Sequence, residues 1–368
     1  MTLIYRIVTL LVLSVWAVVP VSADQTVELY SAEELVKSQS EVQRAAAAKH
    51  ALERVLVRVS GSLQSIESPT VKQALANAQE YVYEYSYAST EQTLLSANGE
   101  QVPASKLNLK FSAALVEQLL RDAGLSYWPA NRPNVLVWAV ENNGDGLRMV
   151  TDTATWSAVR EQAQLRGLPI TVPVFDLEDH LAMPEQSLWQ LDEERILDAS
   201  ERYRADAILA LRYSALSDGS YRGDWQLLHS EGDQSFDGQG QSGDELMLKA
   251  INSAADRFAN VYAIRPSESG AASIVMLIEN ADSFGDFKTV ERYLSSLAVV
   301  RRVEMYSVAA NGLTLQLFTE GDVAQLENTL ALTQTLVPET GVSLSVNRYQ
   351  LRGSVARPLR YRLTEDVQ

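Results

Sequence analysis

The order of strand and helix patterns between residues 273 and 351 limits the possible folds more than any other feature of the chain. Alternating or continuous apolar residues are typical of strands, and apolar residues at helical spacing are typical of amphipathic helices. In chain order the segments are SIVMLIEN, DFKTVERYLSSLA, VVRRVEMYSVAA, LTLQLFTEG, DVAQLENTLALTQ and VSLSVNRYQL, with Asn311-Gly312 as the central hairpin turn. This β-α-β-β-α-β order predicts a ferredoxin-like unit.

The two helices of this unit should cover one face of a four-stranded sheet. One row of apolar side chains is predicted to face them, formed by Val275, Leu277, Leu313, Leu315, Leu317, Leu344 and Val346. The alternate residues of the first strand, Ile274, Met276 and Ile278, are also apolar, so this strand is expected to lie centrally with both faces buried. The second sheet face then needs a cover, because an open apolar face promotes association.

The segment 24–130 predicts a separate α/β unit. A short strand around residues 27–30 precedes the amphipathic helix EVQRAAAAKHALERVLVRVS, which should end at Gly61. A second helix has Ser68 as its N-cap and Pro69 in its first position. The strand KLNLKF and the helix SAALVEQLLRDAGL complete the unit.

Four tyrosines alternate along the predicted strand EYVYEYSYAS, so Tyr81, Tyr83, Tyr85 and Tyr87 are expected to share one face. Such a row can bind a glycan or a peptide. Aromatic rows on strands more often pack under a helix with their hydroxyls at the rim, and this interpretation is favoured.

The stretch SYWPANRPNVLVWAV marks the boundary to a second unit. It follows a helix stop, crosses a proline-rich connector and opens an apolar strand that suits a sheet covered on both faces. Trp128 and Trp138 are predicted to pack at this seam. Arg132 is expected to pair with a neighbouring carboxylate, with a role as a ligand clamp as the alternative.

Strands and helices alternate between residues 131 and 265, which indicates an α/β layer with an added antiparallel hairpin. The polar segment RPSESGAAS that follows is typical of a linker. The predicted parts are a signal peptide (1–23), an N-terminal α/β unit (24–130), a middle α/β unit (131–265), a linker (266–272), a ferredoxin-like unit (273–351) and an arginine-rich tail (352–368).

The first 23 residues predict export. Arg6 is followed by an apolar core from Ile7 to Val19, and small residues precede Asp24, which is the layout of a bacterial-type secretory signal cleaved after Ala23. The apolar core is shorter than the roughly 20 residues that span a bilayer, although retention as an anchor is the alternative. No later apolar run is long enough to span, so the mature chain is expected in the periplasm without a transmembrane segment.

The absence of cysteine excludes a disulfide framework, a thiolate zinc site and a lipid-modified cysteine anchor. It also leaves the ferredoxin-like pattern without ligands for an iron–sulfur cluster, so we expect no cofactor. Loss of Arg6 with the signal leaves 30 Lys and Arg against 47 Asp and Glu, a formal charge of −17. Nucleic acid is therefore not an expected partner, since its binding requires a basic face.

One basic region stands out near the C-terminus. The segment NRYQLRGSVARPLRYRL is a candidate contact for anionic lipid, a glycan or an acidic partner, with a solvated chain end as the favoured alternative. Its arginines are Arg348, Arg352, Arg357, Arg360 and Arg362. Arg301 and Arg302 of the ferredoxin-like unit extend this candidate interaction surface.

Several landmarks, above all NRP-VLVW and RGLP-VP-D, resemble domain-of-unknown-function family 2066, a family of exported proteobacterial proteins. The resemblance covers nearly the whole mature chain. It implies an envelope protein without an assigned activity and supplies no catalytic residues.

The loop FDLEDH is the strongest candidate for chemistry, because it follows a predicted strand at the end where open α/β sheets bind ligands. Its polar residues are Asp176, Glu178, Asp179 and His180. Asp176 and His180 would hold a divalent metal, or His180 would act as a base oriented by Asp179. A solvated acidic loop is the favoured interpretation, since acidic residues are frequent up to Asp206.

The segment GQGQSG (238–243) matches the glycine spacing of a dinucleotide-binding turn. The residues before it are polar, whereas such a turn follows a buried apolar strand, so this interpretation is rejected.

These patterns favour a non-enzymatic interaction or accessory protein of the cell envelope with an unidentified envelope partner. The ferredoxin-like unit is expected to bind that partner through its second sheet face and its basic margin. The alternative is a periplasmic hydrolase or metal-dependent enzyme centred on Asp176 and His180.

Overall fold

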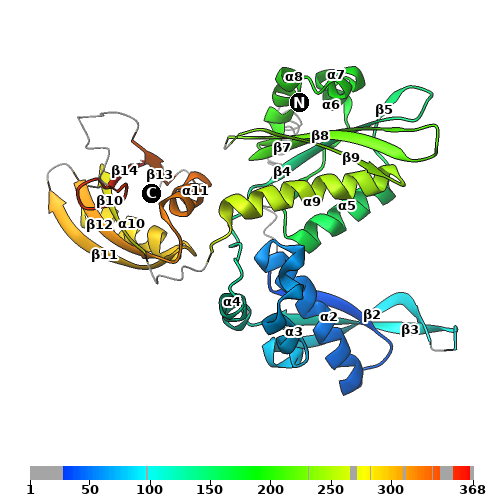
Figure 1. Ribbon diagram of the computed structural model, residues 1–368, viewed down its shortest axis with the longest axis horizontal. Coiled ribbons are helices and arrows are strands. Elements are labelled where there is room, and N and C mark those ends of the chain that lie inside the picture. The colour runs from blue at the N-terminus through cyan, green and yellow to red at the C-terminus, as the bar shows by residue number, and fades with distance from the viewer. Residues whose placement is uncertain are drawn as a thin grey trace, which may run out of the picture.

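A computed structural model describes residues 28–96, 98–230, 232–265, 272–281, 283–309, 312–333, 335–339 and 351–364. Over these residues the chain forms three β-sheets with helices packed against them (Figure 1). The prediction that the chain mixes helices and strands is confirmed. The predicted signal segment lies outside these ranges, and within them no helix has the length and apolar character needed to cross a bilayer.

The first sheet has three antiparallel strands with β3 in the centre. The strands are β1 (Ser31–Val36), β2 (Val82–Leu95) and β3 (Gln101–Phe111). The helices that pack on its apolar face are α2 (Glu41–Ser60), α3 (Pro69–Leu75) and α4 (Ala113–Asp122), joined by 3₁₀ helices at Leu63–Glu67 and Ala78–Tyr81. The buried side chains of β3 are Leu107, Leu109 and Phe111.

Helix α2 begins and ends where its sequence indicates. The hydroxyl of Ser40 accepts a hydrogen bond from the main-chain N–H of Gln43, which caps the first turn. Gly61 has φ 71° and its N–H donates to the carbonyl of Val57, so the helix ends in a left-handed residue.

The tyrosines of β2 do not form the continuous row that strict alternation predicts. Tyr81 belongs to the 3₁₀ helix before the strand, and the pairing with β3 shifts register just after Val82. Tyr81 and Tyr87 pack partly buried against the core, while Tyr83 and Tyr85 are exposed. The favoured packing interpretation therefore holds for Tyr81 and Tyr87 and is wrong for the two tyrosines between them.

The second sheet has six strands in the order β5-β4-β7-β8-β9, with β6 paired to β4. Strands β4 and β7 are parallel, and β8 and β9 form the predicted antiparallel hairpin. The strands are β4 (Val135–Asn142), β5 (Leu147–Met149), β6 (Ile170–Thr171), β7 (Ala207–Ala215), β8 (Tyr221–His229) and β9 (Gln234–Gly240).

Helices cover the two faces of this sheet. Helices α5 (Thr153–Arg166) and α9 (Gly243–Tyr262) lie on the face toward the first sheet (Figure 1). On the other face lie α6 (Leu177–Ala182), α7 (Glu185–Gln190) and α8 (Glu193–Ser200). Trp128 packs at the seam as predicted, but Trp138 points to the opposite face, where its indole N–H donates to Ser200 Oγ at 3.0 Å.

The glycine-rich segment 238–243 runs from edge strand β9 into the first residue of α9. Because β9 is antiparallel to its only partner in the described sheet, the segment does not follow the parallel strand of a dinucleotide-binding unit. A Cβ atom on Gly243 would lie 2.4 Å from the ring of Tyr213. Close helix–sheet packing therefore accounts for this glycine.

The third sheet has five strands in the order β11-β12-β10-β14-β13. The strands are β10 (Ala272–Glu279), β11 (Val300–Ala309), β12 (Gly312–Thr319), β13 (Leu336–Pro338) and β14 (Leu359–Leu363). The helices are α10 (Phe284–Ser296) and α11 (Val323–Ala331), and each begins with a capping box.

Strand β10 is central and buried on both faces, as the sequence predicts. The predicted facing of its side chains is wrong. Ile274, Met276 and Ile278 belong to the core with the helices, opposite the leucines of β12, whereas Val275 and Leu277 lie outside that cluster on the alternate face. Both rows are apolar, so the pattern of β10 by itself contains no signal that distinguishes its two faces.

The fourth position of this sheet is occupied by β14, which comes from the segment predicted as a tail. Strand β14 pairs parallel with β10 and antiparallel with β13. The predicted strand at 342–351, with Leu344 and Val346, lies outside the described residues except for Leu351. The sheet therefore contains a strand that a four-stranded ferredoxin-like sheet lacks.

Arg132 joins the first two sheets from a buried position in the connector. Its guanidinium donates to the main-chain carbonyls of Pro129, Gly167, Arg58 and Trp128 at 2.9, 2.7, 2.9 and 2.6 Å. Its Cζ atom lies 4.2 Å from the centre of the Trp128 ring. The expectation of a carboxylate partner for Arg132 is therefore wrong, since carbonyl oxygens take that place.

Two more buried arginines complete this seam. Arg58 of α2 donates to the carbonyls of Glu28, Ser31 and Gln164, which ties the start of β1 to the end of α5. Burial lowers the pKa of Arg58 to about 10 and that of Arg132 to about 9.

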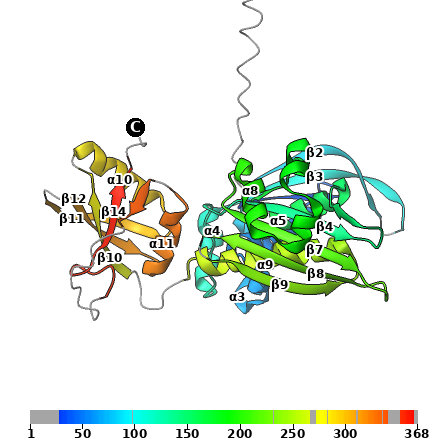
Figure 2. The ribbon, with the colours of Figure 1, turned by 90° about the horizontal axis from the view of Figure 1, so that it is seen from above.

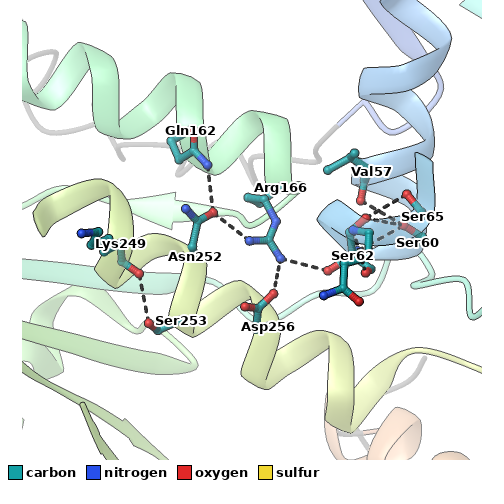
Figure 3. A network of polar contacts seen from close by, with 12 residues as sticks. Val57, Ser60, Ser62, Ser65, Gln162, Arg166, Lys249, Asn252, Ser253 and Asp256 are labelled. Carbon is teal, nitrogen blue, oxygen red and sulfur yellow. Dashed lines mark hydrogen bonds and ion pairs between the residues drawn. The ribbon is translucent and has the colours of Figure 1, made fainter. Parts of the chain in front are cut away.

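Arg166, at the end of α5, makes the third link (Figure 3). It donates to the side chains of Asn252 and Asp256 in α9 and, at 3.0 Å, to the carbonyl of Gly61. The glycine also allows close approach, because a Cβ atom at Gly61 would lie 2.5 Å from Cβ of Ala259. The first two sheets therefore form a single packed body.

The third-sheet unit stands beside the other two (Figure 2), and its buried residues belong to one apolar cluster with those of the first sheet. Tyr127 and Ile264 exchange main-chain hydrogen bonds, and the Tyr127 hydroxyl donates to the carbonyl of Ala298 at 2.8 Å. The side chains of Gln325 and Asn328 in α11 donate to carbonyls at the end of α9 at 3.0 and 3.1 Å.

We predict that Arg132→Met lowers the free energy of unfolding by about 3–5 kcal/mol, because four carbonyls lose their donor in a buried site. Urea denaturation followed by circular dichroism measures this loss. Arg160→Met, an exposed position on α5, serves as the matched control and should change stability by about 0.5 kcal/mol or less. Equal effects of the two substitutions would contradict the role assigned to Arg132.

Candidate functional site

The candidate loop begins at Phe175, four residues after β6 ends. Phe175 has φ 57°, a left-handed conformation that is rare and strained for a residue with a side chain. Its ring lies 6.2 Å from the ring of Trp138 and 6.1 Å from that of Trp156. Packing between two tryptophans therefore holds the turn that starts α6.

Asp176 caps α6 and is held by an arginine. Its Oδ1 accepts the N–H of Asp179 at 3.0 Å. Arg202, in the 3₁₀ helix Glu201–Tyr203 after α8, donates to Oδ1 and Oδ2 of Asp176 at 2.9 and 3.0 Å. Such a two-point contact is the strong geometry for an arginine–carboxylate pair.

Asp179 is the buried member of the group, with only 2% of its surface exposed. Its carboxylate accepts the main-chain N–H of Phe175 at 2.7 Å, the hydroxyl of Tyr203 at 2.6 Å and Nη1 of Arg202 at 3.1 Å. The Tyr203 hydroxyl in turn accepts the N–H of Val174 at 2.9 Å. A buried carboxylate with three donors is a stable structural group.

Asp176 and Tyr203 each keep one protonation state near neutral pH. Hydrogen bonds from Arg202, and then from the Asp179 N–H, lower the pKa of Asp176 to about 2. Burial, together with the hydrogen bond to Asp179, raises the pKa of Tyr203 to about 12. Asp176 is therefore ionised and Tyr203 protonated, and neither is suited to transfer protons at neutral pH.

The structure brings three of the four predicted residues together and leaves out the fourth. Asp176, Glu178 and Asp179 all lie within 4 Å of Arg202, with Glu178 at 3.4 Å. His180 is exposed, and the donors around Asp179 come from other residues. In the part of the chain that the structure describes, no group of three or more metal-binding side chains forms. A guanidinium occupies the position where the carboxylates would bind a cation.

The outer side of α6 is apolar and open. Val174, Leu177 and Leu181 are 67%, 74% and 72% exposed. Leu177 and Leu181 are four residues apart on the helix and so lie on one face. We call these three side chains the α6 apolar face.

Sequence reasoning missed this face because it treated the segment as a loop. A helix signal is present, since an aspartate at the cap precedes two leucines at helical spacing. The helix has only six residues, which is too short for periodicity to be convincing. Phe175 and Arg202, which fix it, act through contacts that the sequence does not reveal.

The arginines of the predicted basic surface are mostly engaged within the third-sheet unit. Arg301 pairs with Glu320, and Arg302 pairs with Glu304 and lies over the ring of Phe318. Likewise, Arg352 pairs with Glu327 and Arg360 with Glu279. Arg357 lies next to the turn at Ser354, and Arg348 lies outside the described residues. The positive charge of this margin is therefore largely compensated by neighbouring carboxylates.

A polar cleft of about 460 Å³ lies between the end of α9 and the start of α11. Its walls include Asn260, Arg265, Glu320, Asp322 and Asn328. Asp322 caps α11, Asn328 bonds the carbonyl of Val261, and Glu320 pairs with Arg301. Asn328 joins the third-sheet unit to α9, and Asp322 and Glu320 are engaged within that unit, so the cleft is secondary to the α6 region as a candidate site.

Part of the chain matches a protein-family model. Residues 23–129 match the model of a domain of unknown function, DUF8605, and no curated protein matches the chain. The matched part contains the first sheet and its helices, and it ends in the connector before Arg132. The assignment to family 2066 is therefore wrong, because the family model that matches is a different one.

We predict that Asp176→Asn destabilises the protein at pH 6 and has a much smaller effect at about pH 2. The folded-state pKa of about 2 lies below the ordinary value of 3.8, so the carboxylate stabilises the fold above pH 3.8. This stabilisation is lost as the pH falls through about 2. Thermal unfolding of both proteins between pH 6 and 2 measures it, and a difference in Tm that is independent of pH would contradict the Arg202 pairing.

Proposed function

We propose that the protein is an exported, non-enzymatic interaction protein of the cell envelope. The observation that carries this proposal is the use of the candidate carboxylates. Asp176 and Asp179 hold α6 in place through Arg202 and Tyr203, and their bonding leaves an apolar face presented outward. Such a face has a natural use in binding another molecule.

The N-terminal sequence supports the exported location. One arginine, an apolar core shorter than a bilayer span and small residues at 21 and 23 are typical of a cleavable signal. A periplasmic location follows from this proposal.

The arrangement of the chain supports a role in positioning a partner. We propose three units in series, residues 24–130, 131–265 and 273–351, the last with a ferredoxin-like order to which β14 is added. The buried arginines make the first two units a rigid frame. The third unit lies outside that frame and is joined to it through Tyr127, Gln325 and Asn328.

We predict that the mature chain begins at Asp24. Mass spectrometry of the N-terminal peptide from the protein purified from cells tests this directly. A chain that begins at Met1 and sediments with membranes would contradict the exported, soluble form.

We predict that the double variant Asp176→Asn, His180→Ala retains the binding partner of the wild type. In-cell crosslinking of a tagged protein, followed by mass spectrometry of the captured chains, gives the measurement. The variant should be less stable than the wild type but still folded with α6 in place, because asparagine keeps the N-cap oxygen and the contacts of Asp179 with Phe175, Arg202 and Tyr203 remain.

Circular dichroism separates loss of catalysis in the double variant from loss of its fold. If the double variant has wild-type circular dichroism but loses the cellular phenotype of the intact gene, chemistry at Asp176 and His180 is required. The matched control is Asp122→Asn with His50→Ala, two exposed positions on helices of the first-sheet unit.

A further inference from the structure

We infer that the α6 apolar face binds a basic amphipathic helix of a partner protein, an inference that rests on the proposed interaction function. Three features carry it: the exposed leucines, the fixed position of the helix that bears them, and the acidic surroundings.

The exposed side chains form an apolar anchor point. Leu177 and Leu181 are among the most exposed large apolar residues of the described chain, and Val174 lies three residues before Leu177. A partner helix with apolar residues at helical spacing presents a matching stripe. Burying the two leucines removes apolar surface from water, which is the main favourable contribution at such contacts.

The helix is held in place before any partner arrives. An isolated helix of six residues is unstable in water, yet α6 is fixed at its start by the Phe175 ring and by the contacts of Asp176 and Asp179. Arg202 and Tyr203 bind those carboxylates from the 3₁₀ helix Glu201–Tyr203. A partner therefore meets a rigid surface and loses little affinity to ordering it.

The charge around α6 selects the partner. Residues 174–206 contain ten Asp and Glu against three Arg. Arg202 is occupied by Asp176, Glu178 and Asp179, whereas Glu193, Glu194 and Asp198 on the adjoining α8 are exposed. Lysines and arginines beside the apolar stripe of a partner would face these carboxylates, which speeds and orients binding.

The same charge disfavours two other occupants. A second copy docked through this face would place acidic residues opposite acidic residues, since a two-fold interface joins the same patch of both chains. An anionic membrane surface would likewise be repelled. A cationic protein segment is the occupant that fits both the leucines and the carboxylates.

Fluorescence anisotropy with a labelled synthetic peptide tests the inference on the mature chain. The peptide carries leucine at helical spacing on one face and lysine elsewhere. We expect saturable binding that weakens with added salt. In the variant Leu177→Gln, Leu181→Gln the dissociation constant should rise about tenfold or more, because the apolar contact is lost.

The controls separate this contact from general attraction to an acidic protein. Leu95→Gln with Leu115→Gln removes two exposed leucines of the first-sheet unit and should leave the affinity unchanged. A peptide of the same composition with leucines spread around the helix should bind at least about tenfold more weakly. In the wild type, peptide binding should slow hydrogen exchange of the α6 amides, a readout that needs no variant.

Three outcomes would overturn the inference. They are absence of peptide binding to the wild type, equal binding by the α6 variant, and binding of anionic phospholipid vesicles in place of the peptide. If the variant Leu177→Gln, Leu181→Gln still captures the in-cell partner, that partner binds another surface. The α6 inference is then wrong, whereas the proposed interaction function is kept. Absence of any partner in wild-type cells would instead count against the proposed function itself.

Discussion

Buried arginines between the first two sheets are the interaction on which the rest of the structure depends. Removing a guanidinium from water is costly, and the pKa of Arg132, lowered to about 9 by burial, reflects that cost. Main-chain carbonyls offset it, since Arg132 alone is bonded to four. Carbonyls at chain turns are fixed in direction, so each hydrogen bond also fixes the angle between the two units.

This seam leaves no room for side chains at two glycines. A Cβ atom at Gly167 would lie 2.0 Å from Nη1 of Arg132, and one at Gly61 would meet α9. Both glycines also have positive φ, at 66° and 71°, so conformation and packing impose the same residue. The frame made in this way carries α6 on the face of the second sheet away from the seam (Figure 1). In the candidate site, Arg202 is likewise surrounded by several acceptors, here the carboxylates of Asp176, Glu178 and Asp179.

Local signals in the sequence predicted local structure well. Ser40 and Gly61 mark the ends of α2, and the all-apolar run of β10 marks a central strand. Signals that depend on distant contacts were weaker. The phase of β10 was assigned incorrectly because both of its faces are apolar, and the partners of Arg132 are carbonyls that no residue type reveals.

For the candidate site, the sequence predicts the acidic loop but neither its arginine partner nor its apolar face. The loop at Asp176 was found from its composition and its place after a strand, and its acidic character was recognised. Its arginine partner lies 26 residues away, at Arg202, so the clamp is visible only in the folded chain. The α6 leucines gave a pattern too short to separate from a loop. Likewise, β14 lies within the arginine-rich segment, whose composition is typical of a solvated chain end.

Native-state hydrogen exchange measures most directly whether the seam makes one body of the first two units. The slowest amides of β3 in the first sheet and β4 in the second sheet should exchange with the same free energy of opening, because neither unit opens alone. The third-sheet unit lies outside the seam of buried arginines and should show its own value. Exchange of β3 amides at a clearly lower free energy than β4 amides would contradict the account, since it would show that the first unit opens independently of the buried arginines.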